Sequence, residues 1–188
     1  FPPQSDWSVP DFFPQFSETE TVAIDLETYD PHLMTCGPGW ATGRGHVVGI
    51  GVATKDWEGY FPIRHEGGGN LDEGIVLRWL TNLLKSTKRE VVFHNALYDV
   101  GWLRREGVIV HGKILDTIIA APLLNENRFS YSLDNLGVEY CDERKDESLL
   151  KNAALAFGIN PKSEMYKLHA KYVGPYGQQD ASLTLKLW

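Results

Sequence analysis

The chain has 188 residues, of which 43% are hydrophobic and 23% charged, and its formal net charge is −7. This composition is typical of one folded domain, and no apolar run approaches the roughly 20 residues that a membrane helix needs. The negative charge argues against a broadly basic protein that coats a nucleic-acid duplex, but it allows an enzyme whose acidic groups surround divalent metals.

The N-terminal segment is rich in proline and aromatic residues and lacks a helical pattern. We expect residues 1–20 to form an extended arm whose rings pack on a domain formed by residues 21–188. The chain starts at Phe1 without a signal-peptide pattern, so we expect a piece trimmed from a longer protein. Cys36 and Cys141 lack metal-ligand spacing and are interpreted as two free thiols of an intracellular protein rather than a disulfide.

The sequence of the first half of the domain predicts an antiparallel meander. Residues 21–28 are β-branched and predict a strand, and residues 46–54 and 59–63 predict two more strands joined by a polar turn. A Gly- and Pro-rich loop is expected between the first two strands, over residues 29–45.

The following segments alternate between helix and strand. Apolar spacing predicts a helix over residues 71–85, a strand over 91–94, a helix over 96–106 and a strand over 108–110. The alternation after a meander indicates an α/β fold with a mixed five-stranded sheet flanked by helices. The remainder is helical in pattern, with expected breaks near Glu126, Cys141, Gly158 and Gly174.

Asp25 and Glu27 stand two residues apart on the first predicted strand, so both side chains point to the same face. Their neighbours in the strand are apolar, and two like charges at such a position are costly unless a cation or hydrogen bonds compensate them. The pair can therefore share a metal. A surface charge pair or a structural ion pair is the alternative.

A second cluster, HNALYD, joins the end of a predicted strand to the first turn of a helix. Asn95 is expected to be the N-cap, with Asp99 about one turn further along. The plain alternative is that Asn95 only caps the helix and Asp99 only complements its dipole. Near the end of the chain, Tyr176 and Asp180 share one face of the last predicted helix, a spacing that is also common for a structural Tyr beside a solvated Asp.

The order of the three clusters resembles the DEDD exonuclease superfamily in its tyrosine-bearing branch, with AIDLET, HNALYD and YGQQD at the three motifs. The histidine-bearing branch has its base five residues before the last Asp, where this chain has Pro175. The sequence after the N-terminal arm, which includes DTIIAAPLLNEN and YSLDNLGVEY, resembles the proofreading domain of phage-type family A DNA polymerases. This resemblance implies a ribonuclease H-like fold, a polymerase domain elsewhere in the parent chain, and a location in the cytoplasm of a bacterial cell or a phage-infected host.

By the same resemblance, Asp25 would bridge two divalent ions, Glu27 and Asp180 would complete the site of the attacking water, and Asp99 would hold the second ion. Hard carboxylate ligands favour Mg²⁺ or Mn²⁺. Tyr176 would orient the nucleophile, because a phenol that titrates near 10 is a poor base at neutral pH. The expected products are nucleoside 5′-monophosphates.

The expected substrate is a single-stranded or frayed 3′ end of DNA, bound by a monomer. Thr28 and Asn95 are candidates for contacts with the terminal nucleotide. His94 and His169 are interpreted as packing or surface residues. Four basic residues could contact phosphates or lie in solvent: Arg128, Lys162, Lys167 and Lys171.

Two other functions remain open from the residues alone. An RNA-trimming exonuclease of the ribonuclease D type would have the same carboxylates and the same Tyr, and no identifiable residue measures a 2′-hydroxyl. A catalytically silent interaction module could retain the fold, although the full set of acidic residues argues against it.

Overall fold

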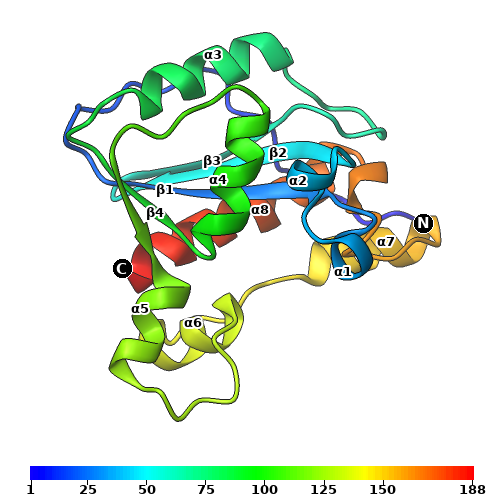
Figure 1. Ribbon diagram of the computed structural model, residues 1–188. Coiled ribbons are helices and arrows are strands. Elements are labelled where there is room, and N and C mark those ends of the chain that lie inside the picture. The colour runs from blue at the N-terminus through cyan, green and yellow to red at the C-terminus, as the bar shows by residue number, and fades with distance from the viewer.

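A single mixed sheet of five strands runs through the computed structural model, which describes residues 1–188 (Figure 1). The strand order is β3-β2-β1-β4-β5, and β1 pairs antiparallel with β2 and parallel with β4. The five-stranded mixed sheet predicted from the sequence is thus confirmed. The strands are β1 (Val22–Tyr29), β2 (His46–Thr54), β3 (Trp57–Pro62), β4 (Glu90–Phe93) and β5 (Lys113–Asp116).

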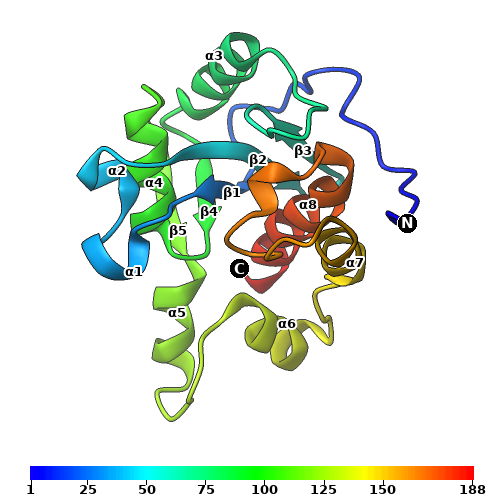
Figure 2. The ribbon, with the colours of Figure 1, turned by 90° about the vertical axis from the view of Figure 1, so that its right-hand side faces the viewer.

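Helices cover both faces of the sheet. α3 (Glu73–Leu84) and α4 (Ala96–Arg105) pack on one face, and α8 (Ala170–Leu187) lies across β1, β2 and β3 on the other (Figures 1 and 2). None of the helices is both long and apolar enough to cross a membrane. The remaining helices are α1 (Leu33–Cys36), α2 (Gly39–Thr42), α5 (Thr117–Leu124), α6 (Leu133–Cys141), α7 (Ser148–Phe157) and the short 3₁₀ turn η1 (Met165–Lys167).

The central strand β1 separates apolar from acidic side chains. Val22, Ile24 and Leu26 belong to the main core, which they form with residues of α3 and α4. Because side chains alternate along a strand, Asp25 and Glu27 point to the opposite face, toward α8. The apolar face anchors the strand, since burial of each such side chain contributes about 1.5–3 kcal/mol.

Residues 1–20 contain no helix or strand, as their composition predicts. Phe13 stacks on Phe61 of β3 with 5.5 Å between the ring centroids. The buried Arg89 donates hydrogen bonds to the backbone carbonyls of Ser17 and Glu20 and so ties the end of this segment to the loop before β4. The segment therefore packs along the sheet on aromatic contacts and a buried arginine.

The break expected near Gly174 is wrong, because α8 continues through both Gly174 and Pro175. A proline inside a helix leaves the carbonyl four residues earlier without its usual donor. Here that carbonyl belongs to Lys171, and it accepts a hydrogen bond from Ser5 Oγ at 2.8 Å. Trp7 lies directly on Gly174, where an added Cβ would come within 2.3 Å of the indole. Contacts from the N-terminal segment thus offset the backbone hydrogen bond that the helix loses at Pro175.

The strand expected over residues 108–110 is also wrong, and the fifth strand is instead formed by residues 113–116. Val108 is buried, and its N–H bonds to the carbonyl of Leu103 at 2.8 Å, which ends α4 rather than starting a strand. The β-branched residues 108–110 favour a strand conformation, but residues 113–116 are the ones that pair with β4, and this pairing determines where the fifth strand lies. The expected loop 29–45 contains the two short helices α1 and α2.

Candidate active site

Three carboxylates meet between the sheet and the last helix. One oxygen each of Asp25, Glu27 and Asp180 lies within 4.8 Å of the others. Two glycines allow α8 to approach β2 and β3 this closely: a Cβ on Gly177 would come within 2.6 Å of the ring of Tyr60 in β3, and a Cβ on Gly51 of β2 would come within 2.3 Å of the Gly177 carbonyl oxygen. Asp180 follows Glu27 by 153 residues in the sequence, and the fold brings it to the pair on β1.

Asp99 is buried in the first turn of α4, beside this group but outside the set of three closest carboxylates. Burial raises its pKa, and repulsion from Asp25 adds to the rise, whereas a hydrogen bond from the Leu26 backbone opposes it. The arrangement therefore consists of three close carboxylates with a fourth as their neighbour.

Asn95 occupies the N-cap position of α4, as the sequence predicted, but it does not cap the helix with its side chain. Asn95 has a left-handed backbone, with φ of 80°, and its side chain forms no cap hydrogen bond. Asp116, at the end of β5, accepts hydrogen bonds from the backbone N–H groups of Asn95 at 3.0 Å and Ala96 at 2.7 Å. A carboxylate from a neighbouring strand thus holds the start of the helix that carries Asp99, and the side chain of Asn95 stays exposed.

Lys145 was not singled out by the sequence, yet it contacts two of the predicted site residues. Its Nζ donates to Asp180 Oδ2 at 2.5 Å and to the Tyr176 hydroxyl at 2.9 Å. Only 10% of its side chain is exposed. Lys145 lies in the charge-rich stretch CDERKDE, which is typical of a solvated loop, so no local signal distinguishes it from its neighbours.

The electrostatics of the group indicate excess negative charge. Burial, reinforced by Asp180, raises the pKa of Asp25 to about 7. Burial also raises the pKa of Glu27 and of Asp180, although Lys145 opposes the rise at Asp180. Asp180 Oδ1 is buried and has no hydrogen-bond partner in the protein. Close, hard oxygen ligands with an unsatisfied buried oxygen fit a divalent cation.

Tyr176 is mostly buried, and its phenol is held in the neutral form. Burial, reinforced by repulsion from Glu27, raises its pKa well above the ordinary value. A phenol of this kind can donate or accept a hydrogen bond but does not act as a base near neutral pH. The ammonium of Lys145 also lies 4.4 Å from the centroid of the Tyr176 ring.

Most of the other residues named in the sequence analysis have identifiable partners within the protein. Thr28 bonds to the Tyr98 hydroxyl at 2.8 Å, and His94 Nδ1 lies 2.8 Å from the hydroxyl of Thr117. His169 caps α8 by accepting the N–H of Lys171. Among the four basic candidates, three have local partners: Arg128 pairs with Glu139, Lys167 pairs with Glu164, and Lys171 lies over the ring of Tyr172. Lys162 instead lines a cleft of about 580 Å³ that Lys145 also borders.

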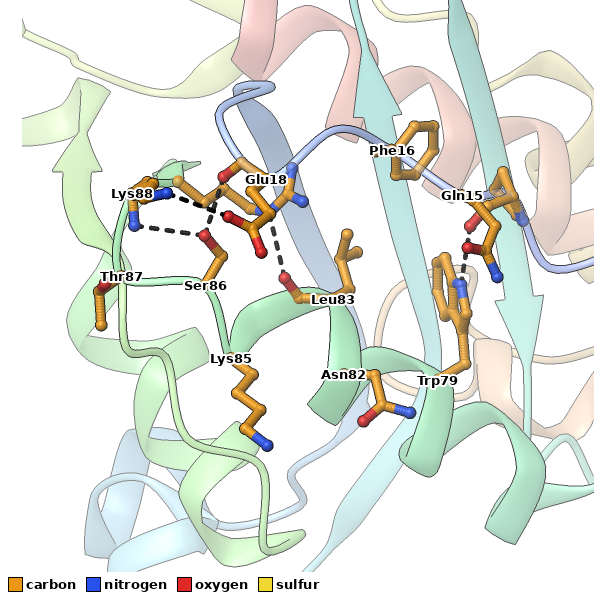
Figure 3. A pocket seen from close by; sticks show the side chains of 12 residues that line it. Gln15, Phe16, Glu18, Trp79, Asn82, Leu83, Lys85, Ser86, Thr87 and Lys88 are labelled. Atoms are coloured by element: carbon orange, nitrogen blue, oxygen red, sulfur yellow. Dashed lines mark hydrogen bonds and ion pairs between the residues drawn. The ribbon is translucent and has the colours of Figure 1, made fainter.

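A second cavity, of about 540 Å³, lies away from the carboxylates, between the N-terminal segment and the end of α3 (Figure 3). Trp79 donates to the carbonyl of Pro14, and Lys88 pairs with Glu18 across it. The basic groups around this cavity thus have partners within the protein, except for the solvent-facing Lys85. It contains none of the predicted site residues.

The strand order β3-β2-β1-β4-β5, with helices on both faces of the sheet, is that of the ribonuclease H-like class of folds, and solved structures agree. NrnC of Brucella melitensis bound to pGG aligns with a TM-score of 0.60 and 18% identity, over 93% of this chain and 73% of that one. The catalytic core of RRP6 from Trypanosoma brucei aligns with a TM-score of 0.57 and 20% identity, over 89% of this chain and 39% of that one. At such identities the likeness shows the fold alone.

The chain belongs to the 3′-5′ exonuclease family, whose model matches residues 6–188. A DNA-directed DNA polymerase of Pseudomonas phage M6 is 40% identical over 97% of this chain and 28% of its own length. DNA polymerase I of Pseudomonas aeruginosa is 26% identical over 92% of this chain and 18% of its own length. The chain thus spans less than a third of these relatives, in which the matching region is part of a larger DNA polymerase.

Proposed function

We propose that this chain removes nucleotides one at a time from the 3′ end of DNA, as the proofreading domain of a family A DNA polymerase of the tyrosine-bearing DEDD type. The observation that carries the proposal is the meeting of Asp25, Glu27 and Asp180 within 4.8 Å, beside Asp99 and Tyr176. Family membership supports the exonuclease activity. DNA polymerases among the relatives favour DNA over the RNA-trimming alternative.

In this proposal, Asp25, Glu27 and Asp180 would hold one divalent ion, and Asp99 would help to hold a second beside Asp25, with Mg²⁺ or Mn²⁺ as the metal. Bound ions of this kind stabilise the attacking and leaving oxygens of an in-line displacement and acidify the attacking water. Tyr176 keeps its proton and orients the water by a hydrogen bond, since burial holds the pKa of its phenol high. The products are nucleoside 5′-monophosphates.

Two exposed or partly exposed residues are proposed to contact the terminal nucleotide. Asn95 has a left-handed backbone conformation. Its side-chain amide, which can both donate and accept hydrogen bonds, has no partner within the protein. Thr28 adjoins Glu27 at the end of β1 and bonds to Tyr98. Of the four basic candidates, Lys162 is proposed to contact a phosphate, because it lines the cleft that Lys145 also borders.

The function is tested with a 5′-labelled single-stranded DNA and an RNA of the same sequence, each incubated with Mg²⁺, Mn²⁺ or EDTA. We expect the DNA to shorten stepwise in a ladder with either metal, to remain intact in EDTA, and to be degraded faster than the RNA. Immediate release of the label as a mononucleotide, or faster loss of the RNA, would contradict the proposed polarity or substrate.

A further inference from the structure

The loop between α6 and α7 holds Lys145 in a fixed place. The backbone N–H of Lys145 donates to Asp134 at 3.0 Å. The side chain of Gln179 in α8 bonds to both neighbours of Lys145: it accepts a hydrogen bond from the N–H of Asp146 at 2.8 Å and donates one to the carbonyl of Arg144 at 3.4 Å. Three side-chain contacts therefore fix the backbone around a buried lysine, which a merely solvated surface residue would not need.

The ammonium of Lys145 joins two groups on successive turns of α8. It bonds to Oδ2 of Asp180 and to the hydroxyl of Tyr176, and no other basic side chain pairs with a carboxylate of the cluster. The other oxygen of Asp180, Oδ1, is buried without a partner. One oxygen of the Asp180 carboxylate thus bonds to Lys145, and the other oxygen is free for a further ligand.

We propose that Lys145 is a positioning residue of the nuclease site, which fixes the Tyr176 hydroxyl relative to Asp180 while leaving Oδ1 of Asp180 free for the divalent ion. This inference rests on the proposed function. Lysine and metal ion occupy different oxygens of one carboxylate, so the lysine need not leave when the metal binds.

The positive charge of Lys145 gives this role a distinctive signature. A cation beside a metal site repels the incoming ion, so its removal strengthens metal binding. The same removal frees Tyr176 and Asp180 to move relative to each other, which slows the reaction. A residue that only stabilised the fold would give the opposite result for the metal, because a loosened site binds the ion more weakly.

The test compares Lys145→Met and Lys145→Gln with wild type by Mn²⁺ calorimetry without substrate and by steady-state cleavage of single-stranded DNA. Lys186→Met is the matched control, since Lys186 also pairs with a carboxylate at 2.5 Å, that of Glu143, but lies half exposed on the surface. We expect both Lys145 variants to bind Mn²⁺ about 3- to 10-fold more tightly and to lose about 10- to 100-fold in kcat, with little change in KM. The control should leave all three unchanged.

The double variant with Tyr176→Phe completes the test. If Lys145 acts through Tyr176, adding Lys145→Met to Tyr176→Phe costs much less in kcat than it costs in wild type. Unchanged or weaker Mn²⁺ binding in the Lys145 variants, or full additivity with Tyr176→Phe, overturns the inference while the active wild type preserves the proposed function. A wild-type chain that neither binds Mn²⁺ nor degrades DNA overturns both.

Discussion

Asp25 connects the stability of the metal-free protein to pH. Its pKa is raised to about 7 by burial and by Asp180, so the folded state retains a proton that the unfolded state releases above its ordinary value of 3.8. The charged form is therefore disfavoured in the fold, and the cost grows from about pH 4 to pH 7 and stays constant above that range.

In EDTA, we expect Asp25→Asn to be more stable than wild type at pH 8, by on the order of 2 kcal/mol, with the gain shrinking as the pH falls toward 4. Urea unfolding across this range measures the difference. Saturating Mn²⁺ should reverse the order at pH 8, because the metal stabilises wild type by binding its carboxylates. A gain that grows as the pH falls would mean that Asp25 is stabilised in its charged form.

Tyr176→Phe should slow cleavage about 10- to 1000-fold, the range of a positioned hydrogen-bonding group, and leave Mn²⁺ affinity within a few-fold of wild type. The hydroxyl bonds to Lys145 and is not one of the three close oxygens. Calorimetry and single-turnover kinetics separate the two effects. Loss of metal as severe as that of an Asp180 variant would instead make the phenol a metal ligand.

At the residue scale, spacing predicted which side chains share a face, because the period of a strand or a helix fixes this; that the acidic residues form one site was expected from the family resemblance. Asp25 with Glu27, and Tyr176 with Asp180, each follow from one strand or one helix. Lys145 does not, since its position depends on contacts from α6 and α8 that are distant in sequence. Asp116 escaped prediction for the same reason: a cap supplied by a neighbouring strand leaves no local pattern around the helix that it caps.

At the scale of elements, the site depends on how closely α8 packs against the sheet. Gly177→Ala would place a Cβ 2.6 Å from the ring of Tyr60, so we expect a loss of about 1–3 kcal/mol and a fall in cleavage as α8 shifts. Gly74→Ala is the control, since its Cβ would meet only ordinary contacts at 3.4 Å in another helix and should be neutral or stabilising by up to about 1 kcal/mol. Equal effects of the two changes would show that helix propensity, and not close packing, decides the outcome.

Most elements could be predicted because their apolar spacing is strong, as in β2 and α3, whereas the errors come from tertiary contacts. Gly174 and Pro175 predicted a break in the last helix. Instead, Ser5 donates to the carbonyl that Pro175 leaves without a donor, and Trp7 packs on Gly174. Residues 108–110 have strand propensity, but residues 113–116 pair with β4. In each case a partner more than ten residues away outweighs a local preference.

At the scale of the whole molecule, the charge of −7 indicates which DNA ends should be preferred. Little basic surface is available to hold a duplex, and opening a terminal pair costs energy that a frayed end does not require. We expect a single strand or a mismatched 3′ end to be digested faster than a blunt, fully paired end, with rates at low DNA concentration that fall as salt rises. Matched 5′-labelled substrates test this order, and faster digestion of the blunt duplex would contradict it.

The central claim is that the acidic cluster between β1 and α8 performs the cleavage. Asp25→Ala and Asp180→Ala each remove one of the three closest carboxylates, so the most direct measurement is the rate at which each variant degrades 5′-labelled single-stranded DNA in Mg²⁺, alongside wild type. Thermal unfolding of the same samples shows that the fold is intact. We predict that both variants fall below about 1% of the wild-type rate, consistent with the loss of metal-ion catalysis; a folded Asp25→Ala protein that keeps more than a few per cent of that rate would contradict the account.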